Sequence, residues 1–245
     1  GINRRQTNDD NWFPQYEYVQ LTDGTIEVKG SFTSCEGGSY PEAGNHKTIL
    51  SGDTMQTIDF GTTSSEYNCF ENLIINNPNV KFASPLYRLG LNQNIKLPDG
   101  DELTVTYLDL NGYTLESTGD ITVNWGARDE NKKGGKVKTT GNVNGVAFSG
   151  DIRVECNQLT TSFYSSYVKG ENNILYGDFV SENGLEFNEG KLEITGNSSI
   201  TSTRNRYNLK MSHPADYLLV HGDFCKNGIN RRQTNDDNWF PQYEY

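Results

Sequence analysis

One short pattern recurs along this chain and constrains its fold more than any other feature. It reads apolar, any residue, apolar, any residue, Gly, then Asp, Asn or Ser. It occurs eight times, with its glycines at Gly30, Gly52, Gly119, Gly141, Gly150, Gly177, Gly196 and Gly222. Alternation at a period of two sends the two rows of side chains to opposite faces of an extended strand. The pattern therefore predicts short strands that are each followed by the same kind of bend.

The glycine and the polar residue after it indicate a corner between two strands. Glycine adopts positive φ at little steric cost, and Asp or Asn side chains bond to the backbone of a turn. The positions of successive corner glycines differ by 22, 67, 22, 9, 27, 19 and 26, so several steps lie near 22 or a multiple of it. Three short strands and three corners fill a coil of that length. We therefore expect an all-β, right-handed parallel β-helix, or solenoid, of about ten coils.

The two ends of the chain are identical. Residues 1–18 read GINRRQTNDDNWFPQYEY, and residues 228–245 repeat them without a substitution. Such identity records a recent duplication or a deliberate choice of ends, and fixed internal periods are typical of repeat architectures. We interpret residues 1–227 as one complete solenoid unit and residues 228–245 as the start of the next. Adjacent identical units, joined end to end, are the expected partners.

An antiparallel β-sandwich is the alternative fold, because its strands also alternate and its turns are also rich in Gly, Asn and Asp. Composition favours the solenoid, since the chain has 28 Asn but only five Ala and Asn side chains can stack as ladders along a solenoid corner. A solenoid also leaves an exposed strand edge at its end, which must be covered or paired. A following identical unit would cover that edge.

The charge balance opposes one class of partner. The 21 basic and 32 acidic residues give a net charge of −11, whereas binding to nucleic-acid phosphates needs clusters of Lys and Arg. We therefore expect no nucleic-acid partner. No stretch of the sequence approaches the roughly 20 apolar residues that span a bilayer, so we expect no membrane span within it.

No cofactor and no metal are expected. The sequence lacks the glycine-rich motifs that bind phosphates and dinucleotides, and its cysteines lack the paired spacing of zinc ligands. The four cysteines are Cys35, Cys69, Cys156 and Cys225. Two interpretations stay open for them: buried small hydrophobic residues, or one or two disulfides.

The repeated end segment differs from the coils. It holds Trp12, Phe13, Tyr16 and Tyr18 around Pro14. Flat aromatic rings stack on the faces of sugars, so one interpretation is a glycan-binding cluster that occurs once per unit. The other interpretation is a packed junction or surface loop that contacts adjacent coils.

Several stretches resemble a known kind of protein. They are HPADYLLVHGDF (residues 213–224), LTDGTIEVKGSF (21–32), GNHKTILSGDTMQTIDF (44–60) and LDLNGYTLESTGDI (108–121). The first three resemble segments, in this cyclic order, of long repetitive cell-surface proteins of anaerobic Gram-positive bacteria, and the last is similar in style. The resemblance implies an extracellular, wall-associated or fibre-forming array at the cell surface. It supplies no catalytic residues.

Three classes of function follow from these features. The first is a structural tandem-repeat protein that forms a stiff surface stalk, fibre or filament. The second is a glycan-binding adhesin module, in which weak sites repeated once per unit act together. The third is a polysaccharide-active enzyme, which needs two carboxylates about 5 to 10 Å apart. Because the corner acids recur with the coils whereas an active site interrupts a pattern, we expect a structural protein that is not an enzyme.

Overall fold

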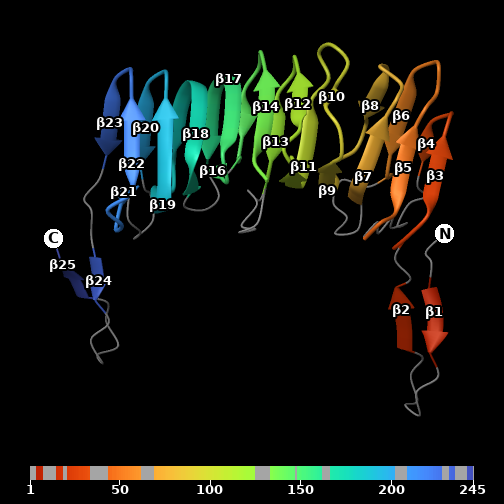
Figure 1. The fold of residues 1–245 in the computed structure, drawn as a ribbon, viewed down its shortest axis with the longest axis horizontal. Coiled ribbons are helices and arrows are strands. Elements are labelled where there is room, and N and C mark those ends of the chain that lie inside the picture. The colour runs from red at the N-terminus through yellow and green to blue at the C-terminus, as the bar shows by residue number, and fades with distance from the viewer. Residues whose placement is uncertain are drawn as a thin grey trace.

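The protein is described here by a computed structural model that places residues 4–7, 15–18, 21–33, 44–61, 69–124, 133–146, 148–161, 166–201, 209–227, 232–234 and 242–244. All regular structure within these ranges is β-strand, and none of it is a helix that could cross a membrane. Figure 1 shows most of the strands standing side by side in one long row. The prediction of an all-β protein is therefore confirmed.

The strands fall into three columns, in which each strand pairs with the equivalent strand of the next coil. The first column contains β3 (Thr25–Val28), β5 (Lys47–Leu50), the end of β7 (Cys69–Ile75), β10 (Ile95–Lys96), β12 (Thr114–Ser117), β14 (Gly135–Thr139), the start of β17 (Ile152–Thr161), the middle of β18 (Ser166–Ser181), the end of β19 (Leu185–Ile194) and β22 (Tyr217–Val220).

The second column contains β4 (Phe32–Thr33), β6 (Gln56–Asp59), β8 (Val80–Phe82), the start of β11 (Leu103–Asp109), β13 (Ile121–Val123), β15 (Val143–Asn144), the ends of β17 and β18, β20 (Ser198–Thr201) and β23 (Phe224–Asn227). The third column contains the start of β7, β9 (Leu86–Leu91), the end of β11, β16 (Phe148–Ser149), the starts of β18 and β19, and β21 (Leu209–Lys210).

Every pairing within these columns is parallel. The first column contains an unbroken ladder of aligned residues in seven successive coils, namely Ile95, Leu115, Val137, Val154, Leu175, Ile194 and Val220. Three strands of the same column, β3, β5 and β7, stack before this ladder. The shortest coil of the ladder leads from Val137 to Val154 and the longest from Ile194 to Val220. This is the β-solenoid predicted from the spacing of the corners, and the sandwich alternative is wrong for the described residues.

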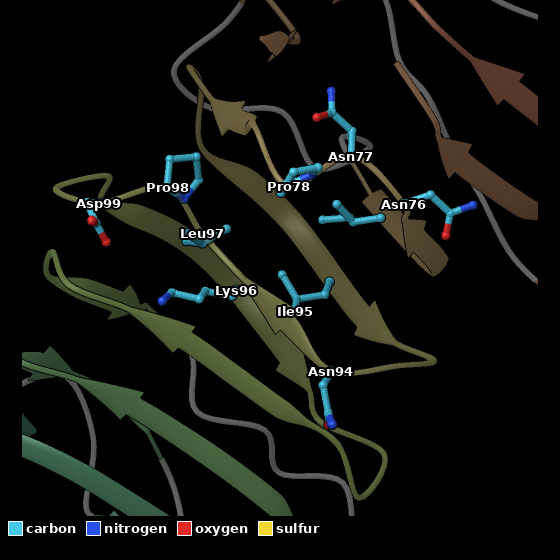
Figure 2. A pocket seen from close by; sticks show the side chains of 10 residues that line it. Asn76, Asn77, Pro78, Asn94, Ile95, Lys96, Leu97, Pro98 and Asp99 are labelled. Carbon is cyan, nitrogen blue, oxygen red and sulfur yellow. The ribbon is translucent and has the colours of Figure 1, made fainter. Parts of the chain in front are cut away.

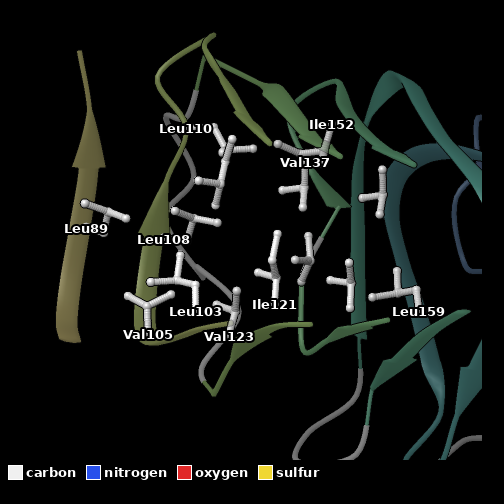
Figure 3. Close-up of a cluster of buried hydrophobic side chains, with 14 of the residues drawn as sticks. Leu89, Leu103, Val105, Leu108, Leu110, Ile121, Val123, Val137, Ile152 and Leu159 are labelled. Atoms are coloured by element: carbon white, nitrogen blue, oxygen red, sulfur yellow. The ribbon is translucent and has the colours of Figure 1, made fainter. Parts of the chain in front are cut away.

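The core lies inside the coils and follows from the alternation of residues. Successive coils of the second column place Leu103, Ile121, Val143 and Leu159 in register, and each is at most 1% exposed. Figure 3 shows such side chains pointing into the interior from neighbouring coils. Burying a side chain of this size stabilises a fold by about 1.5–3 kcal/mol. The neighbouring residue in each strand points outward, which keeps one continuous core along the solenoid.

The repeated end segment forms a different structure. In the first copy, β1 (Arg4–Thr7) and β2 (Gln15–Tyr18) form an antiparallel hairpin, with Gln6 opposite Tyr16. In the second copy, β24 (Arg232–Thr234) and β25 (Gln242–Glu244) form the same hairpin, with Gln233 opposite Tyr243. The register of the two copies is identical. Each hairpin is a two-stranded sheet of its own, and Figure 1 shows both hairpins lying off the same side of the solenoid.

Candidate functional site

The aromatic cluster predicted in the end segment is described only in part. Trp12 and Phe13 lie outside the described residues, while Tyr16 and Tyr18 belong to strand β2 of the hairpin. The structure describes the backbone of these two tyrosines and not their side chains. The glycan-binding interpretation of the four residues therefore stays a prediction. What the structure adds is that their segment is a hairpin separate from the solenoid columns.

The eight predicted corner glycines lie where the chain passes between columns. Seven of them follow one strand and precede the next, and Gly177 lies inside β18 where that strand passes from the first column to the second. A positive φ, which we expected at such corners, occurs only at Gly150 and Gly177. The backbone conformation therefore does not explain the other six.

Close stacking of the corners explains most of the remaining glycines. A Cβ atom added at Gly119 would lie 2.8 Å from the carbonyl carbon of Asp101 and nearer still to its oxygen. A Cβ atom at Gly222 would lie 2.7 Å from the carbonyl oxygen of Gly196. Backbone of the preceding coil fills the space that a side chain would need. Gly30 is the exception, because it has no heavy atom within 4 Å of that position.

The polar residue after several of these glycines links one coil to the next. The carboxylate of Asp120 accepts a hydrogen bond from the backbone N–H of Asn142 (2.7 Å). Further along the solenoid, Asp178 accepts from the N–H of Asn197 (2.8 Å), and the Asn197 side chain accepts from the N–H of Asp223 (2.9 Å). These bonds form a ladder of Asp and Asn side chains along one corner. The side chains are used structurally and hold the coils in register.

A second corner leads from the third column back to the first, and Gly150 is the one predicted corner glycine that lies there. Three residues other than glycine have positive φ here: Asn111 (49°), Asp151 (57°) and Glu189 (55°). Asn173 is 3% exposed and binds three coils together. Its Oδ1 accepts from the N–H of Ile152 (3.0 Å), and its Nδ2 donates to the carbonyl oxygens of residues 169 (2.8 Å) and 191 (3.1 Å). A recurring Asn, Asp or Gly about one coil apart was the available signal.

The outer face of the first column carries alternating charges. Glu116 lies between Lys96 (3.8 Å) and Lys138 (3.5 Å) in neighbouring coils. Glu155 contacts both Lys136 and Arg153 at 2.8 Å. The hydrogen bond from Lys136 lowers the pKa of Glu155, with a further contribution from Arg153, while partial burial opposes the shift. Three of these four ion pairs join neighbouring coils, and the Arg153–Glu155 pair lies within strand β17.

A pocket of about 490 Å³ marks an interruption in the columns. Residues 75–78 and 94–99 line it, and Figure 2 shows Pro78 and Pro98 within its wall. Among the described strands, none links β7 to β10 or β8 to β11 by a ladder, and β9 alone pairs across this point with β11. Proline has no N–H to donate to a ladder. Asp99 is the single carboxylate among the described lining residues, so the lining does not supply the pair that glycoside hydrolysis uses.

The cysteines with described side chains are unpaired. Cys156 and Cys225 are free thiols, and Cys225 is exposed. Burial raises the pKa of Cys156 to about 12, so its thiol is a poor nucleophile at neutral pH. The described part of the chain contains no group of three or more His, Cys, Asp or Glu residues that could hold a metal ion.

The most unusual surfaces are the two ends of the solenoid. At one end, β3 and β4 each pair with a strand on one side only, and at the other end β22 and β23 do the same among the described strands. Phe224 belongs to the ladder of core residues in the second column, yet it is 47% exposed. Ile26 at the opposite end is 37% exposed. Open backbone edges and exposed core residues together make these ends candidate binding surfaces.

Comparisons with protein-family models, with curated protein sequences and with solved structures give no match for this chain.

Proposed function

We propose that this chain is a structural tandem-repeat protein whose units form a stiff stalk, fibre or filament. The observation that carries the proposal is that the described coils from β3 to β23 form one solenoid, joined through β9 where the other two columns are interrupted, with no cap in the described residues at either end. Repeat proteins that end in solution need terminal units with a polar outer face. Ends that expose core residues instead suit a unit that continues into another unit.

The stacking of the coils supports a mechanical role. Parallel backbone ladders, the Asp and Asn ladder at the corner and the ion pairs of the first column all run along the same axis. Strands in a sheet lie about 4.8 Å apart, so ten coils give an axial length on the order of 50 Å per unit. A rod of this kind resists bending because every coil is bonded to the next.

We propose an extracellular location at the cell surface. The support is the resemblance of residues 213–224, 21–32 and 44–60 to repetitive surface proteins, together with the acidic net charge of −11, which favours a solvated, non-aggregating surface. The proposal gives the unit no catalytic role. Antibody labelling of intact cells would test the location, and antigen found only after lysis would contradict it.

Electron microscopy of chains with one, two and four copies of residues 1–227 tests the structural function. We expect straight particles whose length grows by about 50 Å with each copy, as strand spacing requires. Compact particles, or globules joined by flexible connections, would contradict the proposal. Small-angle scattering of the same series gives an independent measure of length in solution.

A second candidate function is glycan binding by the hairpins. The observation that favours it is that both copies of the aromatic segment form the same hairpin outside the solenoid sheets. A glycan array probed with the full chain tests this function. We expect binding to weaken when both Trp12 and Trp239 are replaced by Ala, while circular dichroism stays unchanged. No binding by the unmodified chain would refute it.

A further inference from the structure

We propose that the solenoid continues in register from one unit into the next, and that the hairpin protrudes from the coil that the two units share. In this arrangement β22 and β23 of one unit pair with β3 and β4 of the following copy. The inference rests on the tandem-repeat function proposed above, and it adds the partner of each open end and the register of the pairing.

The first and last coils of the unit carry the same motif. The first has Val28, Gly30 and Phe32 at alternate positions, and the last has Val220, Gly222 and Phe224. In both coils the valine ends a strand of the first column and the phenylalanine begins a strand of the second. Matching the motifs places Val220 opposite Val28 of the next copy. The same register places Phe224 opposite Phe32 and Cys225 opposite Thr33.

The length of the connection agrees with this register. The hairpin occupies residues 4–18, and its two end residues, Arg4 and Tyr18, are cross-strand neighbours, so the chain leaves and rejoins its path at nearly the same point. Without the hairpin, the path from Val220 to Val28 of the next copy runs over residues 221–227, 1–3 and 19–28. This path has the same length as the coil that leads from Ile95 to Leu115. The connection therefore supplies one coil and the hairpin.

The hairpin also begins at the position in the coil where connections vary most. It follows β23, which belongs to the second column. The chain that follows other strands of this column differs in length from coil to coil, from Thr161 to Ser166 in one and from Val123 to Gly135 in another. In other coils, the connection that follows the second-column strand therefore also accommodates extra residues. A hairpin inserted here leaves the first and second columns free to continue.

The open space beside Gly30 indicates a neighbouring coil that the single unit lacks. Its φ is not in the left-handed region, and no heavy atom lies within 4 Å of a Cβ placed on it, so nothing within the described unit requires glycine there. The corner glycines that follow it in the motif, such as Gly52, Gly119 and Gly222, all face backbone of the preceding coil. In the proposed register, the corner at Gly222 of the preceding unit fills the space beside Gly30.

At each end of the unit, the hydrogen-bond ladder of the corner stops at a polar group that makes no hydrogen bond. One group is an acceptor and the other is a donor. Asp223 donates its N–H to Asn197 as the last step of the ladder. Within the described structure, no hydrogen bond is made by the Asp223 carboxylate or by the backbone N–H of Ser31. These two groups occupy equivalent places at the opposite ends of the unit. Stacking in register lets Asp223 accept a hydrogen bond from Ser31 of the next copy and continues the ladder.

The apolar residues at the two ends are complementary as well. Phe32 packs against Phe60, with ring centroids 5.4 Å apart, and Phe60 packs against Phe70 at 5.5 Å. Phe224, which is 47% exposed, lies at the equivalent position of the last coil. Joining the units places Phe224 against Phe32 of the next copy and extends this row of rings. The core then has no exposed end at the junction.

Disulfide crosslinking in a chain of two copies tests the register. Cys225 is kept in the first copy, all other cysteines are changed to Ser, and Thr33→Cys is introduced in the second copy. Paired strands bring Cα atoms about 5 Å apart, which is within the reach of a disulfide. We expect oxidation to crosslink most chains, as detected by mass spectrometry after proteolysis within the hairpin.

The matched control is Asp59→Cys in the second copy in place of Thr33→Cys. Asp59 is the partner of Thr33 in the next coil, so it would lie roughly 10 Å from Cys225, beyond the reach of a disulfide. Crosslinking of Asp59→Cys but not of Thr33→Cys, or of neither, would overturn the proposed register.

Gly30→Val supplies a second measurement in the same crosslinking chain. In the second copy the valine faces the junction, so we expect a clear loss of crosslinking between Cys225 and Thr33→Cys. In the first copy the valine lies at the free end, and the yield should not change. Equal yields for the two variants would refute the packing proposed for Gly30.

Electron microscopy of the two-copy chain separates failure of this inference from failure of the proposed function. Straight rods that do not crosslink at Thr33→Cys would leave the structural function in place and reject the register. Flexible, beaded particles would reject both. Straight rods that crosslink as expected support both.

Discussion

Replacing Gly119 by Ala tests whether the corner glycines are required by close stacking. A Cβ atom at this position would lie 2.8 Å from the carbonyl carbon of Asp101 and 3.1 Å from the carbonyl oxygen of Gly100. Both atoms belong to the backbone of the preceding coil, which cannot move away as the end of a flexible side chain could. The substitution must therefore push two stacked corners apart.

The size of the effect follows from the cost of overpacking, which is typically about 1–3 kcal/mol. We expect about 2–3 kcal/mol for Gly119→Ala, since every close atom is backbone. For a chain of this length, 1 kcal/mol shifts the melting temperature by about 2–4 °C, so the expected decrease is about 4–12 °C. Thermal unfolding followed by far-ultraviolet circular dichroism measures it.

Gly30→Ala is the matched control in the single unit. Gly30 occupies the same position in the motif but has open space beside it and no positive φ. Ala at such a site is tolerated and stabilises by up to about 1 kcal/mol through the unfolded state. If Gly119→Ala and Gly30→Ala melt at the same temperature as the unmodified chain, close stacking is not the reason for these glycines.

Three further predictions concern the second corner, the charged face and the thiols. Asn173→Ala leaves buried backbone groups of neighbouring coils without a hydrogen-bond partner and should lower the free energy of unfolding by about 2–4 kcal/mol, as measured by chemical denaturation. Ala at the exposed Asn172 is the control and should have little effect. Equal effects of the two substitutions would contradict the role of Asn173. Lys136 lowers the folded-state pKa of Glu155 below the ordinary value of 4.5. The ionised Glu155 therefore stabilises the fold above pH 4.5, and this stabilisation is lost as the pH falls through the lowered pKa. Glu155→Gln should therefore lower the melting temperature at neutral pH and lose that effect in acid; a difference independent of pH would refute this. Iodoacetamide should modify the exposed Cys225 rapidly and Cys156 slowly, since burial raises the pKa of Cys156 to about 12, and both should react in denaturant; equal rates in the folded chain would contradict the burial of Cys156.

The recurring motif was sufficient to predict the architecture. Alternate apolar residues such as Leu115 and Ile121 predicted inward rows, and the separation of glycines such as Gly119 and Gly141 predicted a coil of about 22 residues. Both signals are local, because the alternation within a strand and the number of residues in a coil can be read directly from short stretches of the sequence. The structure confirms the solenoid that they predicted.

The reason for each corner glycine was beyond the sequence. Glycine meets two different needs, positive φ and close approach of another backbone, and in both cases the only visible sign is the absence of a side chain. The structure shows which need applies: Gly119 faces the carbonyl of Asp101 without a positive φ, whereas Gly177 combines a φ of 145° with a close approach of the Cys156 carbonyl. At the second corner the motif predicted only Gly150 and Asp151, because Asn111 and Glu189 adopt positive φ outside that motif.

The sequence by itself determined the strand pattern, the coil length and the repetition of the end segment, because each depends on residues close together or on direct identity. Only the tertiary structure decided which coils stack, where the columns are interrupted between Ile75 and Ile95, and that the end segment pairs with itself as a hairpin. These features depend on contacts between residues a full coil apart, such as Asn197 with Asp223. The strength of such contacts depends on the distance between two stacked backbones. The sequence of one coil does not give that distance.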